Sequence, residues 1–366
     1  MPPDILTTLP IREPIWTART VCVDRRKLTR SALVRSIVSA ASDFSAVVVN
    51  GASGFSETYS DLFAAAAIAR RRLEAPIVVS ECTWKKGRSA LRHHARRTAS
   101  HLIDSPRTYF CVLSHEDRDA AARQWGLNID RIFVTPYCYT LTQEAIAGPV
   151  TSDGGVFAGG NSMRDYAPLL TAARGLNLPV TLATRRVSPK EVSDNVRAGT
   201  VTHQEFIAQL RSAGVVVVPL EARSDRSAGQ QTYLNAMALG KLVIVTDTLG
   251  VREYVDDGRT GILVPAGDAD AMGRALRWVL EPANADPVDR IRLEGREVAL
   301  RRFGPDAYAR ALLAVVDEGL ERVKRQRRLP RYPYSSYLRS TVGSPPTVGG
   351  PSEASAGGSP ALRRAS

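Results

Sequence analysis

The sequence predicts an α/β protein with two parallel sheets, each covered by helices on both faces. Three observations lead to this prediction. Short runs that are apolar throughout, such as residues 46–49 and 215–219, alternate with segments whose apolar residues recur at helical spacing. Strands without polar positions are buried on both faces, as in parallel sheets. The alternation pauses over residues 139–154 and then restarts, and a chain of 366 residues usually needs more than one core.

The first half supplies five expected strands with helices between them. Residues 30–41 illustrate a helix, because Leu33, Ile37 and Ala41 lie on one face. We expect the strands at residues 20–23, 46–49, 77–79, 109–113 and 132–135. We expect the other helices near residues 59–73, 91–103 and 116–125. Residues 1–19 are polar and rich in proline, and we expect a loose arm there.

The second half repeats this pattern after the pause. The expected strands are residues 156–158, 180–183, 215–219, 242–245 and 262–264. The expected helices are residues 165–174, 204–212, a short one before residue 240, 268–280, 288–303 and 306–322. We therefore divide the chain into an arm (1–19), a first domain (20–140), a linker (141–154), a second domain (155–322) and a tail (323–366).

The net charge of +12 is concentrated in the tail. Residues 323–366 hold eight Lys/Arg and one acid, a charge of +7, which leaves +5 for residues 1–322. Basic charge of the folded part therefore gives little reason to expect a nucleic-acid partner. The tail is rich in Arg, Pro, Tyr, Ser and Gly and cannot bury enough apolar surface to offset the entropy of ordering, so we expect disorder.

The four cysteines indicate neither disulfides nor a metal site. They are far apart and form no CxxC pair, and Cys22 and Cys111 lie in apolar runs where a buried thiol is usual. The N-terminus lacks the pattern of a signal peptide, and no apolar run reaches the length of a membrane span. We expect a cytoplasmic protein without metal or cofactor.

Residues 227–247, SAGQQTYLNAMALGKLVIVTD, combine a turn, a short helix and a buried strand. Gly240 separates the helix from the strand, where a residue with positive φ is favoured. The opposite end of the helix presents Gly229, Gln230, Gln231 and Thr232. Unpaired N–H groups and the helix dipole favour an anion at such an end. We expect it to hold the phosphate of an activated sugar.

The second half resembles a known enzyme family. LNAMALGKLVIVTDTLGVREYVDDGRTGILVPAGDADAM resembles the donor-binding half of retaining GT-B glycosyltransferases of the family 4 (group 1) type. FAGGNSMRDYAPLLTAA and GTVTHQEFIAQLRSAGVVVVPL are similar to segments that precede it in that family. The resemblance covers about residues 155–322 and implies a GT-B fold with two Rossmann-like domains. It implies a nucleoside diphosphate sugar as donor substrate and retention at the anomeric carbon.

The resemblance directs attention to a second loop, which follows the strand at 156–158. Its glycines allow close approach of backbone N–H groups to phosphate, and Arg164, together with Arg185 or Arg186 after the next strand, can supply positive charge. In the family an Arg and a Lys neutralise the diphosphate; the Lys is missing here, and Arg164 is the expected substitute. The expected donor-binding residues are Gly159, Gly160, Asn161, Arg185, Val201, Ser227, Gly229, Gln230, Gln231, Thr232 and Asn235, and Arg164 is an expected catalytic residue.

Two glutamates that are typical of the family are absent. Alignment on residues 236–238 places Ser227 and Asn235 at their positions. Asn235 can still bond ribose or sugar hydroxyls, and Ser227 can still contact the donor. A nearby carboxylate would have to come from elsewhere, and the candidates are Glu221, Asp225 and Glu253. Their absence leaves an inactive homologue open as an alternative, together with a nucleotide-sugar epimerase.

The acceptor side of the site is expected at strand ends of the first domain, because loops there line the crevice of such sheets. The candidates are Gly54, Glu57, Glu81, Trp84 and Lys85. His115, also at a strand end, is expected to hydrogen-bond the transferred sugar. The acceptor is a carbohydrate or a lipid-linked molecule.

A basic segment lies in the first domain. Residues 85–97 contain six Lys/Arg and no acid, which fits either a solvated helix face or attraction to an anionic membrane surface. Leu91, Ala95 and Leu102 form a thin apolar face that we expect to pack on the sheet.

An oxidoreductase is disfavoured because no GxGxxG follows the first strand.

Overall fold

The computed structural model describes residues 2–24, 28–52, 56–71, 75–86, 89–148, 154–222 and 225–328. Residues Met1–Lys324 form one compact unit. The tail predicted to be disordered lies outside the described residues apart from its first six. Residues 149–153 of the predicted linker are also outside them.

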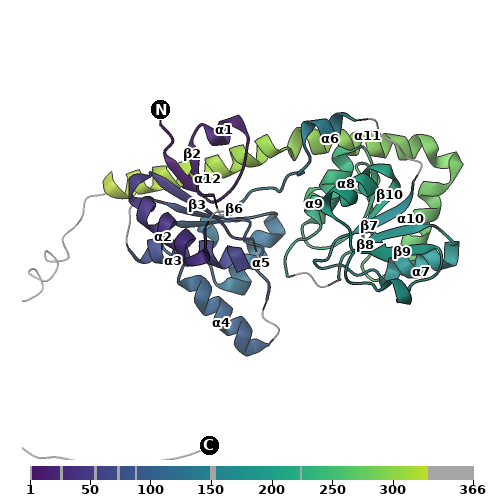
Figure 1. The fold of residues 1–366 in the computed structure, drawn as a ribbon, viewed down its shortest axis with the longest axis horizontal. Coiled ribbons are helices and arrows are strands. Elements are labelled where there is room, and N and C mark those ends of the chain that lie inside the picture. The colour runs from purple at the N-terminus through teal and green to yellow at the C-terminus, as the bar shows by residue number, and fades with distance from the viewer. Residues whose placement is uncertain are drawn as a thin grey trace, which may run out of the picture. The chain divides into compact units, whose positions relative to one another are not determined.

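The first sheet has six parallel strands in the order β2-β1-β3-β4-β5-β6. Its strands β2, β3 and β6 are labelled in Figure 1. The strands are β1 (Ile5–Thr7), β2 (Thr20–Cys22), β3 (Ala46–Asn50), β4 (Ile77–Ser80), β5 (Thr108–Val112) and β6 (Ile132–Val134). The helices of this half are α1 (Pro14–Thr17), α2 (Arg30–Ala40), α3 (Ser56–Arg70), α4 (Ala90–His101) and α5 (His115–Trp125). The five predicted strands are confirmed.

The prediction of a loose arm at residues 1–19 is wrong. β1 lies between β2 and β3, with Leu6 opposite Val21 on one side and Val47 on the other. Ile5 is fully buried. A run of three residues is too short to show periodicity, so the strand is identified only by the partners that bury it.

The order of strands also corrects the expectation for Cys22. β2 is an edge strand, and Cys22 is exposed. Cys111, in the interior strand β5, is buried as predicted. None of the four cysteines, all of which the structure describes, forms a disulfide.

The second sheet is also six-stranded, in the order β12-β11-β10-β7-β8-β9. Its strands are β7 (Gly154–Gly159), β8 (Val180–Ala183), β9 (Val196–Gly199), β10 (Ala213–Val218), β11 (Leu242–Thr246) and β12 (Ile262–Val264). The helices are α6 (Gln143–Ala147), α7 (Ala167–Leu176), α8 (His203–Ser212), α9 (Gln230–Ala238), α10 (Ala269–Leu280), α11 (Ala285–Arg302) and α12 (Pro305–Arg328). β9 was not predicted; it is an edge strand in which only Val196 is buried.

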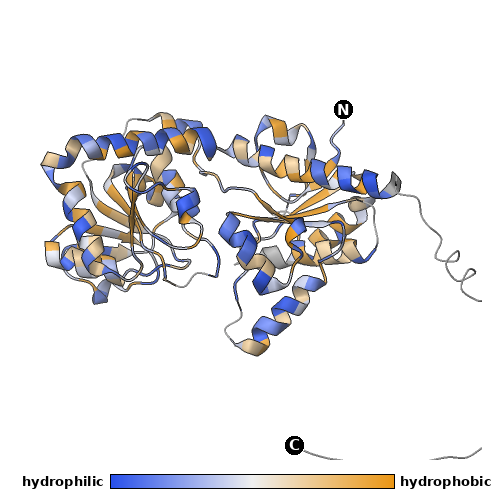
Figure 2. Cartoon of the chain, turned by 180° about the vertical axis from the view of Figure 1, so that it is seen from behind, coloured by the Kyte–Doolittle hydropathy of each residue, from blue (hydrophilic) through white to orange (hydrophobic). Residues whose placement is uncertain are grey.

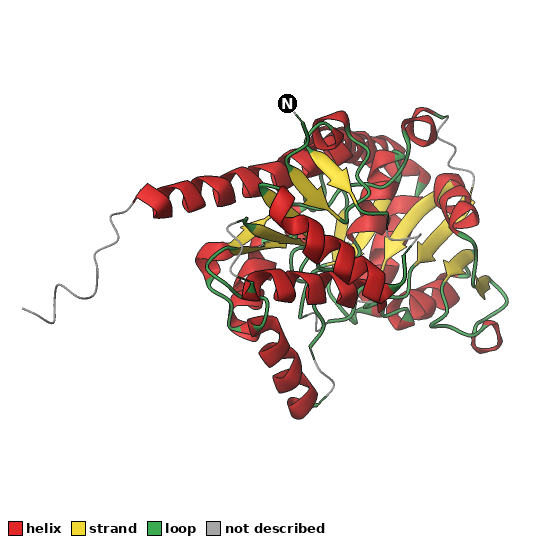
Figure 3. Cartoon of the chain, turned by 60° about the vertical axis from the view of Figure 1, so that its left-hand side comes forward, coloured by secondary structure: helices red, strands yellow, loops and turns green. Residues whose placement is uncertain are grey.

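Helices cover both faces of the second sheet, as the uninterrupted valines of β10 require. Val216 packs with Leu234 of α9 on one face. Val217 packs with Leu169 of α7 and Met272 of α10 on the other. Figure 2 shows the hydrophobic strands between helices that carry hydrophilic residues, and Figure 3 shows helices over both sheets.

Two helices depart from expectation. α12 follows the second half in the sequence, but Leu312 and Val316 pack with Val48 of the first sheet. The apolar face of α4 was expected to pack on the sheet, yet Leu91 is 79% exposed and Leu102 is 43% exposed. Only Ser100 of α4 is buried, so this helix is mostly surrounded by solvent.

Candidate functional site

Two loops meet at the carboxyl edge of the second sheet. One follows β7 and spans residues 159–162, and the other follows β10 and leads into α9. β7 and β10 are parallel neighbours, with Phe157 opposite Val216 (Figure 1). Parallel neighbours end at the same edge, so their loops lie side by side.

The amino end of α9 begins at a glycine. Its N-cap, Gly229, has φ of +89° and offers no side-chain hydrogen bond to the helix. A Cβ at this position would lie 3.0 Å from Val218 Cγ1, so glycine fits both the angle and the space. The N–H of Thr232 already donates to the carbonyl of Gly229 over 2.9 Å, so within the described residues the N–H groups of Gln230 and Gln231 are the ones left for a ligand. Gln230 and Thr232 are buried at this end, whereas Gln231 is exposed.

Arg164 brings a buried positive charge to this end. Its side chain is 5% exposed. Nε donates to the carbonyl of Gly159 over 3.1 Å, Nη1 to that of Ser162 over 2.8 Å, and Nη2 to Thr232 Oγ1 over 3.1 Å. Burial lowers the pKa of Arg164. Among the residues that the structure describes, no carboxylate forms an ion pair with it.

Arg226 is a second cation at the same loop, and sequence reasoning missed it. Its Nη2 donates to Ser162 Oγ over 3.0 Å. Its Nε is buried without a hydrogen-bond partner in the described part of the chain. Burial lowers its pKa, and the carboxylate of Asp117 has the opposite effect. The only sequence signal was its position beside Ser227.

The loop after β7 is shaped by packing as well as by hydrogen bonds. A Cβ at Gly159 would lie 2.4 Å from the ring of Phe206, and one at Gly160 would lie 2.9 Å from Arg164 Nη2. Asn161 Oδ1 accepts the N–H of Arg185 over 2.8 Å, which fixes the next loop. The side chain of Arg185 is exposed.

The other predicted donor residues either form hydrogen bonds within the protein or pack against apolar side chains. Asn235 is 1% exposed, and its Oδ1 accepts the N–H of Thr140 over 2.7 Å. Gln231 Nε2 donates to Thr140 Oγ1 over 3.2 Å. Ser227 is 1% exposed and hydrogen-bonded to Asp117. Val201 is half-buried against the core beneath α8 and α9.

His115 pairs with Glu253 of the second half. Glu253 accepts the backbone N–H of His115 over 2.7 Å, and the two side chains are 2.8 Å apart at Nδ1. The imidazole is 76% exposed. Among the three acids considered as substitutes, Glu253 is thus held by His115, and Glu221 pairs with Arg186 over 2.7 Å.

The predicted acceptor residues fall into different environments. Trp84 is buried, donates to the carbonyl of Gly51 over 2.9 Å, and packs edge-on against Trp125. Lys85 is exposed as a whole residue. Its pKa is lowered, first by partial loss of water around the amine and then by repulsion from Arg226. Gly54 lies outside the described residues, and the side chain of Glu57 is not described.

Glu81 is the most unusual of this group. It is half-buried and has φ of +50°, a rare angle for a residue other than glycine. Its Oε1 accepts the hydroxyl of Tyr308 over 2.8 Å. Burial raises the pKa of Glu81, and this hydrogen bond partly opposes the rise. Strained, partly buried acids are frequent at functional sites.

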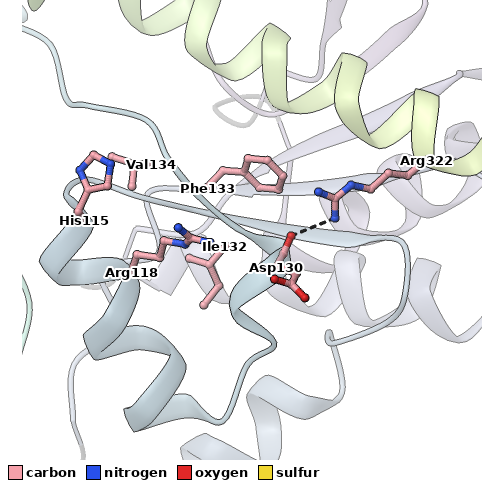
Figure 4. A pocket seen from close by; sticks show the side chains of 7 residues that line it. All are labelled: His115, Arg118, Asp130, Ile132, Phe133, Val134 and Arg322. Carbon is pink, nitrogen blue, oxygen red and sulfur yellow. Dashed lines mark hydrogen bonds between the residues drawn. The ribbon is translucent and has the colours of Figure 1, made fainter.

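A cavity of about 650 Å³ lies beside His115 (Figure 4). Arg118 of α5, Phe133 of β6 and Arg322 of α12 contribute to its wall. Arg322 Nη1 donates to the carbonyl of Asp130 over 3.0 Å. None of the residues at the open end of α9 lines this cavity, so it is separate from the site of Arg164.

The comparisons with known proteins place part of the second half in a known family's range and show the fold. Residues 169–282 match the family model of group 1 glycosyl transferases. A sequence comparison with curated proteins gives no match. The resemblance to group 1 glycosyltransferases is therefore confirmed for residues 169–282, a range that includes α9 and the strands on both sides of it but not Gly159 to Arg164.

Solved structures show the fold. A glycosyltransferase from Rickettsia africae is 12% identical, with a TM-score of 0.57, over 83% of this chain and 86% of that one. Alr3699/HepE from Anabaena, in complex with UDP-glucose, is 13% identical, with a TM-score of 0.60, over 82% of this chain and 86% of that one. Sucrose-phosphate synthase from Thermosynechococcus elongatus is 18% identical, with a TM-score of 0.57, over 82% of this chain and 83% of that one. The chain has the GT-B fold, as the sequence predicted.

Proposed function

We propose that this chain is a glycosyltransferase that moves a sugar from a nucleoside diphosphate to an acceptor hydroxyl, with retention at the anomeric carbon. One observation carries the proposal: the buried guanidinium of Arg164 lies at the uncapped end of α9 without a carboxylate partner in the described residues. A buried charge is costly unless it is paired, so this arrangement favours an anionic ligand.

The proposed chemistry follows from the charge of the leaving group. As the bond to the sugar breaks, negative charge develops on the nucleoside diphosphate. Arg164, Arg226 and the N–H groups of α9 are fixed donors that stabilise this charge without reorganising. The UDP-glucose complex of the Anabaena protein supports a uridine nucleotide as the first donor to test. In the family that the sequence resembles, retention is thought to need no protein nucleophile.

We place the acceptor against the first half of the chain, near Glu81 and Lys85. Lys85 is close enough to Arg226 for repulsion to contribute to its lowered pKa, so it lies toward the donor loop. The partly buried carboxyl of Glu81, with its raised pKa, suits contact with acceptor hydroxyls. We propose the first sheet with its helices as the acceptor domain and the second sheet with its helices as the donor domain; β1 and α12, which pack in the first sheet's core, move from the predicted arm and donor domain to the acceptor domain.

A membrane surface is the second partner that we propose, together with a lipid-linked acceptor. α4 exposes Leu91 and carries Arg92 and Arg97 on exposed positions. A helix with basic residues and a protruding leucine suits the headgroup region of an anionic bilayer. No helix in the described part of the chain is long and apolar enough to span a membrane. The location that we propose for the enzyme is the cytoplasmic face of a membrane.

A second candidate is a GT-B homologue that binds a sugar nucleotide without turning it over. The observation in its favour is that Ser227 and Asn235, which stand where the resembling family has glutamates, are buried and already hydrogen-bonded to the first half. Binding of UDP without any release from UDP-sugars would support this candidate.

The test is a turnover assay with the full chain. Purified protein is incubated with UDP-glucose and other nucleotide sugars, with sugar and lipid acceptors, and released nucleoside diphosphate is measured. We expect release that depends on acceptor and is lost in Arg164→Ala. Absence of release and of binding across the whole panel would contradict the proposal.

A further inference from the structure

The first turn of α5 is hydrogen-bonded to the loop that precedes α9. Asp117 is 5% exposed and lies in that turn. Its Oδ1 accepts the N–H of Ser227 over 2.7 Å, and its Oδ2 accepts both Ser227 Oγ and, over 2.9 Å, Ser114 Oγ. A single carboxylate therefore binds both the backbone and the side chain of a residue 110 positions away.

Neighbouring residues of the same turn add two contacts with the second half. Glu116 Oε2 accepts the N–H of Gly250 over 2.6 Å, and His115 pairs with Glu253. Gly250 is packed tightly here: a Cβ on it would lie 2.6 Å from Ser114 Oγ. Three successive residues of α5 thus hold two loops of the second half.

Asp117 is the buried member of this group, and its partner, Ser227, lies in the loop that leads into α9. Ser227 follows Arg226, which donates to Ser162, and precedes Gly229, at which α9 begins. Gln230 Nε2 donates to Ser227 Oγ over 2.5 Å, so the first residue of α9 is tied to the same point. Burial raises the pKa of Asp117, and its hydrogen bonds with Ser227 oppose this rise.

We propose that Asp117 is a positioning residue for the diphosphate site: by fixing Ser227, it sets the placement of Arg226 and of the amino end of α9. The inference rests on the proposed function and adds that the first half of the chain supplies a carboxylate that shapes the donor site. Asp117 acts through Ser227 and need not contact the donor.

The experiment measures the affinity of the full chain for UDP by titration calorimetry, well below the melting temperature of the weakest variant. We expect Asp117→Ala to weaken binding at least tenfold and Ser227→Ala to weaken it less, since the backbone N–H of residue 227 keeps its acceptor. The double variant should bind no more weakly than Asp117→Ala, because both changes remove one shared contact. Asp117→Asn, which keeps an oxygen for that N–H, should be intermediate.

Two controls separate positioning from general loss of stability. Asp119→Ala changes an exposed acid of the same helix and should leave UDP affinity unchanged. Val48→Ala, in the buried core of the first sheet, should lower the melting temperature without changing affinity. Wild-type affinity in Asp117→Ala and Asp117→Asn, or strictly additive losses in the double variant, would overturn the inference alone. If the wild-type chain does not bind UDP, the same series is run with the nucleoside diphosphate of the panel that it binds; failure to bind any of them would overturn the proposed function and the inference with it.

Discussion

Arg164 donates a hydrogen bond to Thr232 Oγ1 over 3.1 Å, which joins the loop after β7 to the first turn of α9. The remaining nitrogens of the guanidinium donate to the carbonyls of Gly159 and Ser162. Neutral oxygens therefore fix the position of the charge, and no ion pair within the described residues cancels it. A bound diphosphate would supply the negative charge that this buried guanidinium lacks.

Gly229→Ala should destabilise the protein and distort the open end of α9. The residue has φ of +89°, and the new Cβ would lie 3.0 Å from Val218. We expect the free energy of unfolding to fall by about 1–2 kcal/mol, the usual cost of a left-handed conformation. Urea unfolding measures the change. Gly175→Ala, in α7 with no atom within 4 Å of the new Cβ, should instead stabilise by about 0.5–1 kcal/mol. Equal effects of the two substitutions would contradict this account of Gly229.

Glu81 should make stability fall as pH rises above the acid range. Because burial raises its pKa, the folded chain keeps this proton at pH values where the unfolded chain, with a glutamate pKa of about 4.3, has lost it. The folded state then binds more protons, so the free energy of unfolding decreases with rising pH across that window. Glu81→Gln, which stays neutral and can still accept from Tyr308, should remove this decrease and be more stable at neutral pH.

A matched acid with the opposite shift serves as control for Glu81. Glu205 accepts the N–H of Thr202 over 2.7 Å, and this bond lowers its pKa. Its contribution is present at neutral pH and is lost as pH falls through the lowered pKa, so Glu205→Gln should alter only the acid side of the profile. Urea unfolding at a series of pH values tests both. An unchanged neutral limb in Glu81→Gln would show that this carboxyl titrates normally.

Reversal of one charge on α4 should weaken attachment to anionic vesicles. Arg92 is exposed on a helix that also exposes Leu91. Each basic residue near such a surface contributes about 1 kcal/mol, so Arg92→Glu should reduce binding by about 2 kcal/mol. Sedimentation with vesicles of phosphatidylcholine and phosphatidylserine measures this at low and at higher salt. Arg35→Glu, an equal charge change at an exposed position of α2, should have little effect. Equal losses in both variants would indicate a response to net charge alone.

Elements with a strong local pattern were predicted correctly from the sequence. The apolar runs of β3, β10 and β11 can be recognised from the sequence, because a strand buried on both faces needs apolar residues at every position. The glycines around α9 mark the two ends of that helix. β1 was missed, since its three residues acquire their burial only from β2 and β3. α4 was expected to pack, but the spacing of Leu91 and Leu102 says nothing of whether a sheet lies beneath them.

The site was predictable only in part, for the same reason. The helix end at Gly229 and the charge of Arg164 follow from local sequence. Arg226 and Asp117 do not: the first depends on which way a loop side chain turns, and the second on a contact between residues 110 positions apart. Such pairings are set by packing of the two sheets and their helices, which a single sequence does not display.

The most direct test of the central claim is titration of UDP into wild-type protein and Arg164→Ala. Removal of one fixed donor to developing negative charge typically costs about 2.7–4 kcal/mol in catalysis, and we expect a loss of similar order or smaller in ground-state binding. Arg174→Ala, an exposed arginine on α7, is the control and should bind as the wild type does. Tight binding by wild type and a large loss in Arg164→Ala alone is the predicted result. Equal UDP affinity in all three proteins would contradict the assignment of the diphosphate site to Arg164 and α9.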